Sequence, residues 1–244
     1  DPRLRGGLSS CSRQGHRLIG VITVQDVVDY MEEESKEVYN KLAGIAEGDG
    51  SEDMKETLAA SMKKRLPWLI ALLFLGMFVS SVVGMFEGIV SKVAILVCFQ
   101  SLILDMAGNV GTQSLAVTIR VLMDEEITFK TRLALVWKEV KIGMANGGLL
   151  GIVSFLCIGV YVWLFKGNSI LYGFAVSACV GISLVLAMAI SSFAGTVIPL
   201  FFHKIKVDPA VASGPLITTV NDLVAVVTYY GMAWLMLFHL FHLA

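Results

Sequence analysis

The distribution of apolar residues divides the chain into a polar amino-terminal part and a long apolar part. The apolar part begins near residue 66 and consists of five stretches separated by short polar segments. Each stretch is long enough to cross the hydrocarbon core of a bilayer, which takes about 20 residues of helix. We therefore predict an all-α membrane protein with five transmembrane helices: Leu66–Gly84, Val93–Ile119, Ile142–Phe165, Ile170–Phe202 and Val207–Leu243.

The amino-terminal part contains three different patterns. Residues 1–15 are polar and without period, so we expect them to be disordered. Leu18–Ser35 predicts a short strand, an N-cap at Thr23 and an amphipathic helix. Residues 36–65 predict an acidic connecting helix, interrupted by Gly48–Gly50, whose acidic face is either simply solvated or a regulatory cation-binding surface. The expected domains are thus 1–35, 36–65 and a five-helix pore domain at 66–244.

Basic residues beside the spans predict the orientation. Ten Lys and Arg residues lie on the side that holds the amino terminus, and two, Lys92 and Lys166, lie on the other. Because cytoplasmic loops are enriched in basic residues, the amino terminus is expected inside the cell and the carboxyl terminus outside, in a multi-pass cell-membrane protein. The amphipathic stretch within Met123–Val140 is expected along the cytoplasmic interface. Since 56% of the 244 residues are hydrophobic and 16% charged, the expected partner is a lipid bilayer and not nucleic acid.

The last span carries carboxylates where hydrocarbon is expected. Asp208 and Pro209 form a typical helix start, which predicts one helix over Asp208–Tyr229. Asp208 and Asp222 would then lie about 21 Å apart along it, and Pro215 would bend it. A carboxylate at membrane depth marks an ion or proton path by default, unless it is protonated or paired with Lys from another helix. The polar or small residues at three- and four-residue steps are Asp208, Ala212, Pro215, Thr218, Asp222, Ala225 and Tyr229.

The second span has a comparable polar face. Asp105, Asn109 and Gln113 are spaced by four and lie on one side of a helix. Taken alone, such a row favours hydrogen bonds to other helices; beside the stripe of the last span, a shared water-lined pathway is the better account. Glu87, in the short loop before this span, is expected at the outer mouth. Gly143, Gly147 and Gly151 in the third span predict close helix packing.

Several motifs resemble known families. GVITVQDVVDYMEEE (Gly20–Glu34) resembles the closing strand and helix of a CBS (cystathionine-β-synthase) domain. KKRLPWL (Lys63–Leu69), Phe86–Glu87, MAGNVGTQSLAV (Met106–Val117) and DPAVASGPLITTVNDL (Asp208–Leu223) occur in the order typical of the MgtE family of magnesium channels and transporters. This resemblance covers the chain from about Lys63 onward.

The resemblance to MgtE proteins implies a homodimer with five transmembrane helices per subunit and a central pore lined by the second and fifth. It implies that Asp222 from both subunits holds the transported Mg²⁺, with backbone carbonyls near Gly214 and Thr218. Asp208 matches a carboxylate on the cytoplasmic side of the pore. Asp105, Asn109, Gln113 and Ala225 are the expected pore-lining residues. The family's amino-terminal domain and first CBS domain have no counterpart in these 244 residues, so the resemblance does not extend to the family's closure by cytosolic magnesium.

Physical chemistry is consistent with this interpretation and leaves alternatives. Mg²⁺ loses water reluctantly and is held by one or two carboxylates with retained waters, so a symmetric Asp222 pair suffices. No phosphate-binding loop is visible, which indicates gradient-driven transport. The resemblance implies a transporter and not an enzyme. One alternative is a proton- or sodium-coupled transporter of another divalent metal (Co, Mn or Zn). A remote one is an intramembrane aspartyl hydrolase using Asp105 and Asp222, although Asp105 is expected toward the outer half of its helix.

Overall fold

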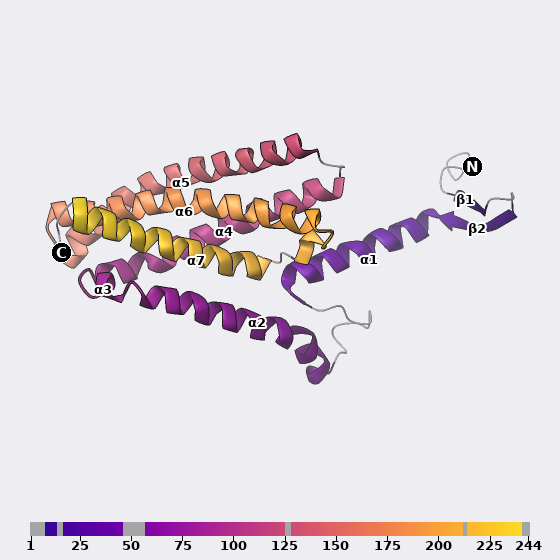
Figure 1. Cartoon of the computed structure of the whole chain (residues 1–244), viewed down its shortest axis with the longest axis horizontal. Helices are drawn as coiled ribbons and strands as arrows, with labels where there is room; N and C mark the ends of the chain where they lie inside the picture. Colours follow the sequence, from indigo (N-terminus) through magenta and orange to yellow (C-terminus); the bar gives the residue numbers. More distant parts are fainter. Residues whose placement is uncertain (1–7, 14–16, 46–56, 125–127, 212–213, 241–244) are drawn as a thin grey trace.

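The protein is a bundle of long helices with an amino-terminal extension, as the computed structural model shows (Figure 1). The structure describes residues 8–13, 17–45, 57–124, 128–211 and 214–240. The extension comprises β1 (Leu8–Arg13), β2 (Arg17–Thr23) and α1 (Val24–Ala43). The bundle comprises α2 (Leu58–Gly84), α3 (Glu87–Val90), α4 (Ile95–Asp124), α5 (Phe129–Lys166), α6 (Ile170–Lys204), the 3₁₀ turn η3 (Pro209–Val211), α7 (Gly214–Ala233) and the π-helical η4 (Trp234–Leu240).

Five helices are long and apolar enough to span a membrane, so the predicted number of spans is confirmed. They are α2, α4, α5, α6 and the segment formed by α7 and η4. Two of them begin earlier than the hydrophobic pattern predicts. α2 includes the basic Lys63–Arg65, and the amphipathic stretch before the third span is the continuous beginning of the 38-residue α5. Helical hydrogen bonding continues beyond the apolar residues, so both helices include the polar residues that precede the predicted spans.

α6 forms the centre of the bundle. It is apolar or small on all sides and has 17 buried residues, from Gly173 to Leu200. Such a helix is typical of a core position, because every face needs cover. α4, α5 and α7 pack around it, whereas α2 lies at the edge beside α7 and has no buried residue (Figure 1).

A seam of glycines joins α5 to α6. A Cβ added to Gly147 would lie 2.8 Å from the Val185 Cα atom, and one added to Gly151 would lie 2.8 Å from the Gly181 carbonyl oxygen. Only hydrogen fits at such distances, so the two backbones are in direct contact. The predicted role of the glycine repeat in close packing is confirmed.

The extension differs from its prediction in two places. Leu8–Arg13 form β1, which pairs antiparallel with β2, so the expectation of disorder is wrong for these residues: the free edge of β2 pairs with the chain just before it. Thr23 caps α1 as predicted, in a reciprocal capping box with Asp26. α1 runs unbroken through the expected boundary at residue 35 and ends at Gly44, whose φ is 70°. The predicted break at Gly48–Gly50 and the remainder of residues 1–15 lie outside the described residues.

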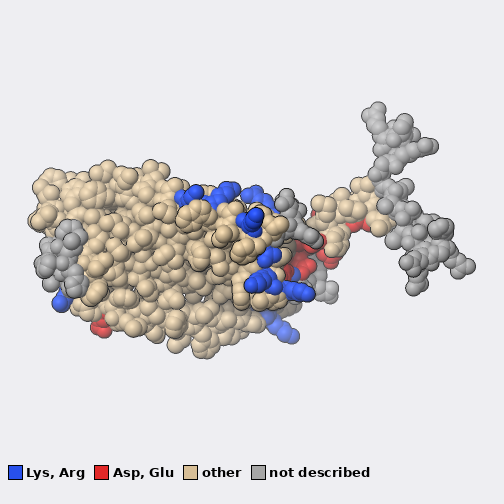
Figure 2. Space-filling view, turned by 45° about the horizontal axis from the view of Figure 1, so that its top comes forward, with Lys and Arg blue, Asp and Glu red and all other residues tan. Residues whose placement is uncertain are grey.

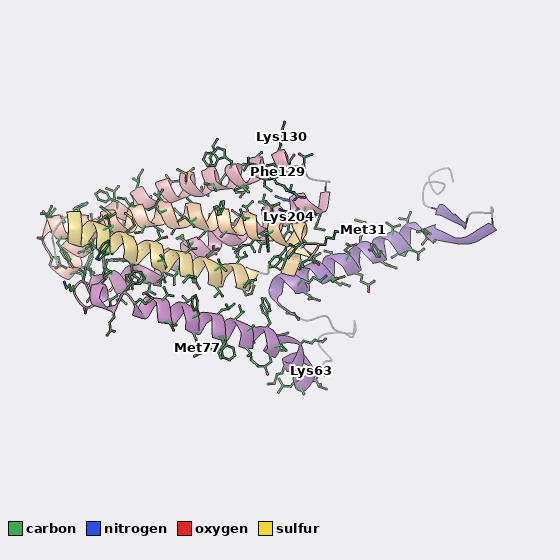
Figure 3. All side chains as sticks on the ribbon, viewed as in Figure 1. Met31, Lys63, Met77, Phe129, Lys130 and Lys204 are labelled. Carbon is green, nitrogen blue, oxygen red and sulfur yellow. The ribbon has the colours of Figure 1, made fainter. Side chains whose placement is uncertain are left out.

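Basic side chains gather at the end of the bundle that α1 approaches (Figure 2). Lys63, Lys130 and Lys204 come from α2, α5 and α6, yet they lie at this same end (Figure 3). Met77, in the second half of α2, points away from the bundle with 58% of its surface exposed, as a lipid-facing side chain would. The bundle thus has a charged end and an apolar flank.

Candidate functional site

Asp208 lies before the last span and not inside it. The Ala210 N–H donates to Asp208 Oδ1 over 2.9 Å, which starts η3, and α7 begins only at Gly214. The prediction of one helix from Asp208 to Tyr229 is therefore wrong, and with it the 21 Å spacing along a single helix. Asp208 does cap a helical turn, but this turn is the 3₁₀ turn η3 and not the beginning of α7. Pro215 stands in the first turn of α7, where no N–H partner is needed, so it makes no bend. Ala212 lies outside the described residues.

Asp208 has a basic partner from the extension. Lys41, near the end of α1, donates to Asp208 Oδ2 over 2.8 Å, so the alternative of a Lys partner from another helix holds for this carboxylate. Burial raises the pKa of Asp208, but the hydrogen bonds from Lys41 and from the Ala210 N–H outweigh it and hold the pKa below its usual value. Lys41 also pairs with Glu37 on its own helix.

The end of α1 rests on the bundle through further contacts. Leu42 packs against a cluster formed by Leu115 and Ile119 of α4 and Ile217 of α7. Gly44, which ends α1, lies against the ring of Trp68 in α2. The carboxyl-terminal end of α1 therefore contacts α4 and α7, the helices predicted to line the pore, at the end of the bundle where basic side chains gather (Figure 2).

Asp222 and Thr218 are partly exposed on α7, whereas Ala225 and Tyr229, farther along the same side of the helix, are completely buried in the core of the subunit. The predicted stripe is therefore covered by the subunit's own helices in its second half. The single chain does not expose Ala225, so its assignment as pore-lining stays a prediction. The Thr218 hydroxyl donates to the Gly214 carbonyl over 2.9 Å, which engages one of the carbonyls predicted to support an ion.

α4 presents its polar row on the outside of the single chain. Asp105, Asn109 and Gln113 are all exposed, while Ile103, Ala107 and Val110 beside them are buried. Asn109 Nδ2 donates to Asp105 Oδ1 over 3.1 Å, a hydrogen bond within α4. No hydrogen bond from these three to another described helix is present in the structure, so the row does not tie the subunit's own helices together.

The contacts between α4 and α7 fix their relative depth. Tyr230 donates to Gln100 Oε1 over 2.6 Å near one end, and Gly108 lies against Thr218 farther along, so the helices are antiparallel. Asn221 of α7 lies against Gly111 of α4, so Asp222 is placed beside the Gly108–Gly111 segment of α4. The expectation that Asp105 lies nearer the outer surface stays a prediction.

Two glycines allow α4 its close approach. A Cβ on Gly111 would meet the Asn221 side chain, and a Cβ on Gly195 of α6 would meet the Gly111 carbonyl oxygen. Asn221 itself is completely buried between the helices. The position of Asp222, the next residue, follows from this contact, since α7 cannot rotate while Asn221 fills the space beside Gly111.

Glu87 stands apart from these residues. It is the exposed first residue of α3, in the connection between α2 and α4 at the end of the bundle remote from α1 (Figure 1). The preceding Phe86 stacks on Tyr230, with ring centroids 5.5 Å apart. This location agrees with a mouth residue on the far side, which stays a prediction.

One buried carboxylate was missed by the sequence reasoning. Glu139 of α5 is 4% exposed, and its Oε2 accepts a 3.0 Å hydrogen bond from the Ser114 hydroxyl of α4. A signal was available, because Leu135, Glu139, Gly143 and Gly147 recur every four residues on the face that packs inward. Within the described residues no three His, Cys, Asp or Glu side chains gather as a metal-binding group.

Five spanning helices, with exposed polar side chains and a half-buried carboxylate at membrane depth, define a multi-pass membrane protein organised around a polar face. The family model described as MgtE, a divalent cation transporter, matches residues 100–232. The chain belongs to the MgtE family.

Three proteins that align with almost the whole chain are each described as magnesium transporter MgtE. The chain is 41% identical over 216 residues to the protein of Bacillus subtilis, 38% identical over 218 residues to that of Enterococcus faecalis, and 32% identical over 222 residues to that of Thermus thermophilus. These alignments cover 88%, 88% and 91% of this chain. The chain spans about half the length of these relatives: 45%, 45% and 47%. The family is one of transporters and not of enzymes, which removes the intramembrane hydrolase alternative.

Proposed function

We propose that this chain forms a homodimeric channel that carries Mg²⁺ across the membrane down its electrochemical gradient. The pore would run along the two-fold axis between the subunits, lined by α4 and α7. The family of the chain and the names of its relatives support a divalent cation, and Mg²⁺ in particular, as the transported ion.

The observation that carries the proposal is the exposed polar row of α4 beside Asp222. A carboxylate and two amides facing hydrocarbon cost several kcal/mol, so such a surface in a membrane needs either a protein partner or water. A second copy related by a two-fold axis would supply both, because it brings the same polar face opposite the first and encloses water between them. Asp105 of α4 and Asp222 of α7 would give that enclosed path an acidic zone.

The proposed acidic zone suits hydrated Mg²⁺. One Asp222 from each subunit would hold the ion through its retained waters, and Asp105 would add negative charge to the path. Asn109, Gln113 and Thr218 would offer further hydrogen-bonding groups along the path. A divalent ion gains about 4.6 kcal/mol per 100 mV on entering a negative interior, so no energy-coupling site is required.

The orientation belongs to the proposal as well. The end with α1 and the basic side chains would face the cytoplasm and Glu87 the outside. Asp208 would then stand at the cytoplasmic mouth, where the Lys41 ammonium neutralises it and α1 leans on the mouth through Leu42. An ion leaving the pore would displace this contact. Residues 20–34 resemble only the closing strand and helix of a CBS domain, so the extension is not expected to act as a sensor on its own.

The decisive test is Asp222→Asn in proteoliposomes loaded with a Mg²⁺-sensitive dye. This change preserves the side-chain volume but removes both central charges of the dimer. We expect uptake to fall to the rate of protein-free vesicles while the dimer stays intact on size-exclusion chromatography. Asp208→Asn is the matched control: it removes a carboxylate at the mouth and should slow uptake much less.

Two outcomes would contradict the proposal. Uptake by the Asp222→Asn dimer at the parent rate would place the central site elsewhere. Uptake that requires an imposed proton or sodium gradient, and vanishes under voltage alone, would favour the coupled transporter of another divalent metal. Competition of Co²⁺, Mn²⁺, Zn²⁺ and Ca²⁺ with Mg²⁺ in the same vesicles measures the selectivity.

A further inference from the structure

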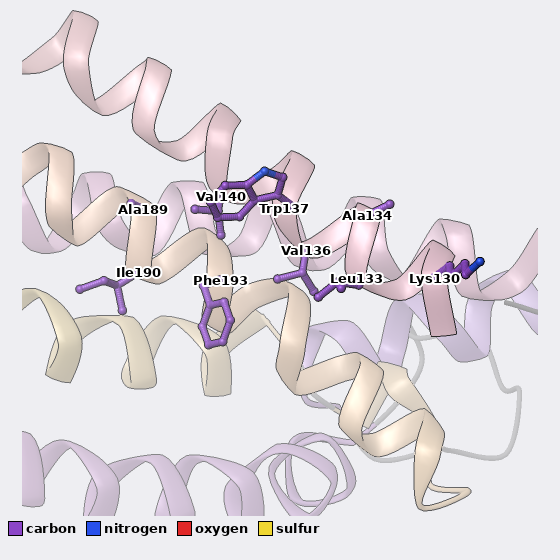
Figure 4. Close-up of a pocket in the computed structure, with 9 residues that line it drawn as sticks. All are labelled: Lys130, Leu133, Ala134, Val136, Trp137, Val140, Ala189, Ile190 and Phe193. Atoms are coloured by element: carbon purple, nitrogen blue, oxygen red, sulfur yellow. The ribbon is translucent and has the colours of Figure 1, made fainter. Parts of the chain in front are cut away.

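A groove with a volume of about 800 Å³ opens on the flank of the bundle between α5 and α6 (Figure 4). Leu133, Trp137 and Val140 of α5 form one wall, and Ile190 and Phe193 of α6 form the other. Lys130 stands at one end of this row (Figure 4). Trp137 is 59% exposed and Phe193 47%, so large apolar surfaces line a space that the subunit itself does not fill.

The groove begins where the glycine seam ends. From Gly143 onward α5 touches the backbone or short side chains of α6, as the contact of Gly143 with Ser192 shows. Before Gly143 the facing positions carry the larger Val140 and Val136, which hold the helices apart. The opening is thus built into the sequence of α5.

The depth of the groove corresponds to a membrane boundary. Ile190 and Phe193 lie 20 and 23 residues after Ile170, where α6 begins. At a rise of 1.5 Å per residue this is about 30 to 35 Å, close to the thickness of the hydrocarbon core. Lys130 lies about 10 Å beyond Trp137 along α5, which reaches the level of lipid headgroups. The apolar walls therefore border acyl chains, and the charged end borders phosphates.

The exposed charges that the structure describes on Phe129–Lys141 of α5 are basic. Lys130, Lys138 and Lys141 are exposed on α5, and Lys141 Nζ lies 5.6 Å from the centre of the Trp137 ring. The one acidic residue between Phe129 and Lys141 is Glu139, which is buried and bonded to Ser114. Basic pockets between spanning helices at a membrane surface favour anionic headgroups.

We infer that this groove binds an anionic phospholipid from the leaflet on the α1 side. One acyl chain lies between Trp137 and Phe193, and the Lys130 ammonium binds the phosphate. The Trp137 indole lies at the boundary between the two, where its amphipathic ring is favourable. This lipid contacts α5 and α6 and takes no part in the polar face of α4 and α7.

The test uses quenching of Trp137 fluorescence by brominated lipids. Trp68, Trp163 and Trp234 are replaced by Phe, and the chain is reconstituted with brominated phosphatidylglycerol or brominated phosphatidylcholine in otherwise unbrominated vesicles. We expect phosphatidylglycerol to bind beside Trp137 several-fold more tightly. Lys130→Gln should reduce this preference about fivefold, which corresponds to the roughly 1 kcal/mol that one basic side chain contributes near an anionic surface.

Matched controls separate the site from general lipid contact. Lys166→Gln removes a basic residue at the opposite end of α5 and should leave the preference unchanged. Ala189→Phe narrows the groove and should reduce quenching by either lipid, whereas Ala71→Phe on the exposed flank of α2 should not. Native mass spectrometry of the unsubstituted chain should show phosphatidylglycerol retained with one molecule per subunit, and Lys130→Gln should lose it.

Equal quenching by the two lipids in the parent chain, together with no lipid retained in the mass spectrum, would overturn the inference. Absence of quenching by both lipids would overturn it as well, because Trp137 would then be covered by protein and the groove would be an interface between copies of the chain.

Discussion

Asp222 and Glu139 are both carboxylates within spanning helices, yet their surroundings are opposite. Asp222 is half-buried on the face that also presents Thr218, while Glu139 is enclosed and bonded to Ser114 of a neighbouring helix. An acidic residue in an apolar span can therefore lie on an accessible face or inside the packed core, and only the packing of its helix distinguishes the two cases. In the proposed pore the first carboxylate would face the ion, whereas the second links α5 to α4.

The link between Glu139 and Ser114 predicts a stability effect. Ser114→Ala leaves a buried carboxylate oxygen without its donor, which costs about 1 to 3 kcal/mol. We expect the thermal unfolding midpoint of the detergent-solubilised protein to fall by several degrees. Glu139→Gln keeps an acceptor oxygen and should change the midpoint less. Ser81→Ala is the control, because the exposed Ser81 hydroxyl bonds only to the Met77 carbonyl of its own helix; an equal loss there would refute the assignment.

A second residue-level prediction concerns Lys41 and Asp208. The pKa of Asp208 is below its usual value in the folded state, so the contact is complete at neutral pH, above the ordinary pKa of about 3.9. It is lost as pH falls through the lowered pKa. For a pair this exposed we expect at most about 1 kcal/mol. The Trp68 ring lies against Gly44 at the end of α1, so Trp68 fluorescence should shift when acidification breaks the contact. Lys41→Gln should produce the same shift at neutral pH. A pH response unchanged by Lys41→Gln would exclude this pair as its origin.

At the scale of helices, the close contact between the α5 and α6 backbones means that substitutions at two adjacent glycines of α5 should affect stability differently. Gly147 lies against the Val185 backbone, whereas a Cβ on Gly148 would meet nothing within 4 Å. Gly147→Ala should destabilise the protein by about 1 to 3 kcal/mol, since backbone atoms must move. Gly148→Ala should be neutral or stabilising by up to about 1 kcal/mol, as expected for an exposed helical glycine. Thermal unfolding of the two variants makes the comparison, and equal effects would show that the seam is not tightly packed.

The sequence predicted those helices whose signals are strong and local. Spans are long and apolar because hydrocarbon requires it, and the four-residue repeat of Gly143, Gly147 and Gly151 directly indicates a packed face. The beginning of α7 was mispredicted because Asp208 and Pro209 start a 3₁₀ turn with the same cap that starts an α-helix. Ala225 lies on the predicted side of α7 but is covered by the subunit's own core, which no local pattern indicates.

Contacts between distant segments could not be predicted from local patterns. Lys41 lies 167 residues before Asp208, and neither residue signals the other. The depth of Asp222 beside α4 depends on the register between α4 and α7, which the contacts of Gly108, Gly111 and Tyr230 set together. A row of polar residues reveals which side of a helix is polar, but its depth follows from the packing.

At the scale of the whole molecule, a single chain in a bilayer would leave Asp105, Asn109 and Gln113 exposed to lipid. The exposed surface of α2, which includes Leu73 and Phe78, is apolar and can face lipid without a protein partner. The proposed dimer gives the two sides of the bundle different surroundings: lipid along α2, and water enclosed by a second subunit along α4 and α7.

This difference predicts a pattern of chemical accessibility. In a background with Cys11, Cys98, Cys157 and Cys179 replaced, single cysteines are introduced in reconstituted protein. Asn109→Cys, Gln113→Cys and Thr218→Cys should react with a charged, membrane-impermeant thiol reagent, because water fills the proposed path and thiolates form only there. Leu73→Cys, in lipid, and Ala225→Cys, in the packed core, should not react. Mg²⁺ at saturating concentration should slow the reaction at Thr218→Cys, nearest the acidic zone. Reaction at Leu73→Cys comparable to that at Asn109→Cys, or none at any of the three polar positions, would contradict a water-filled pore between two subunits.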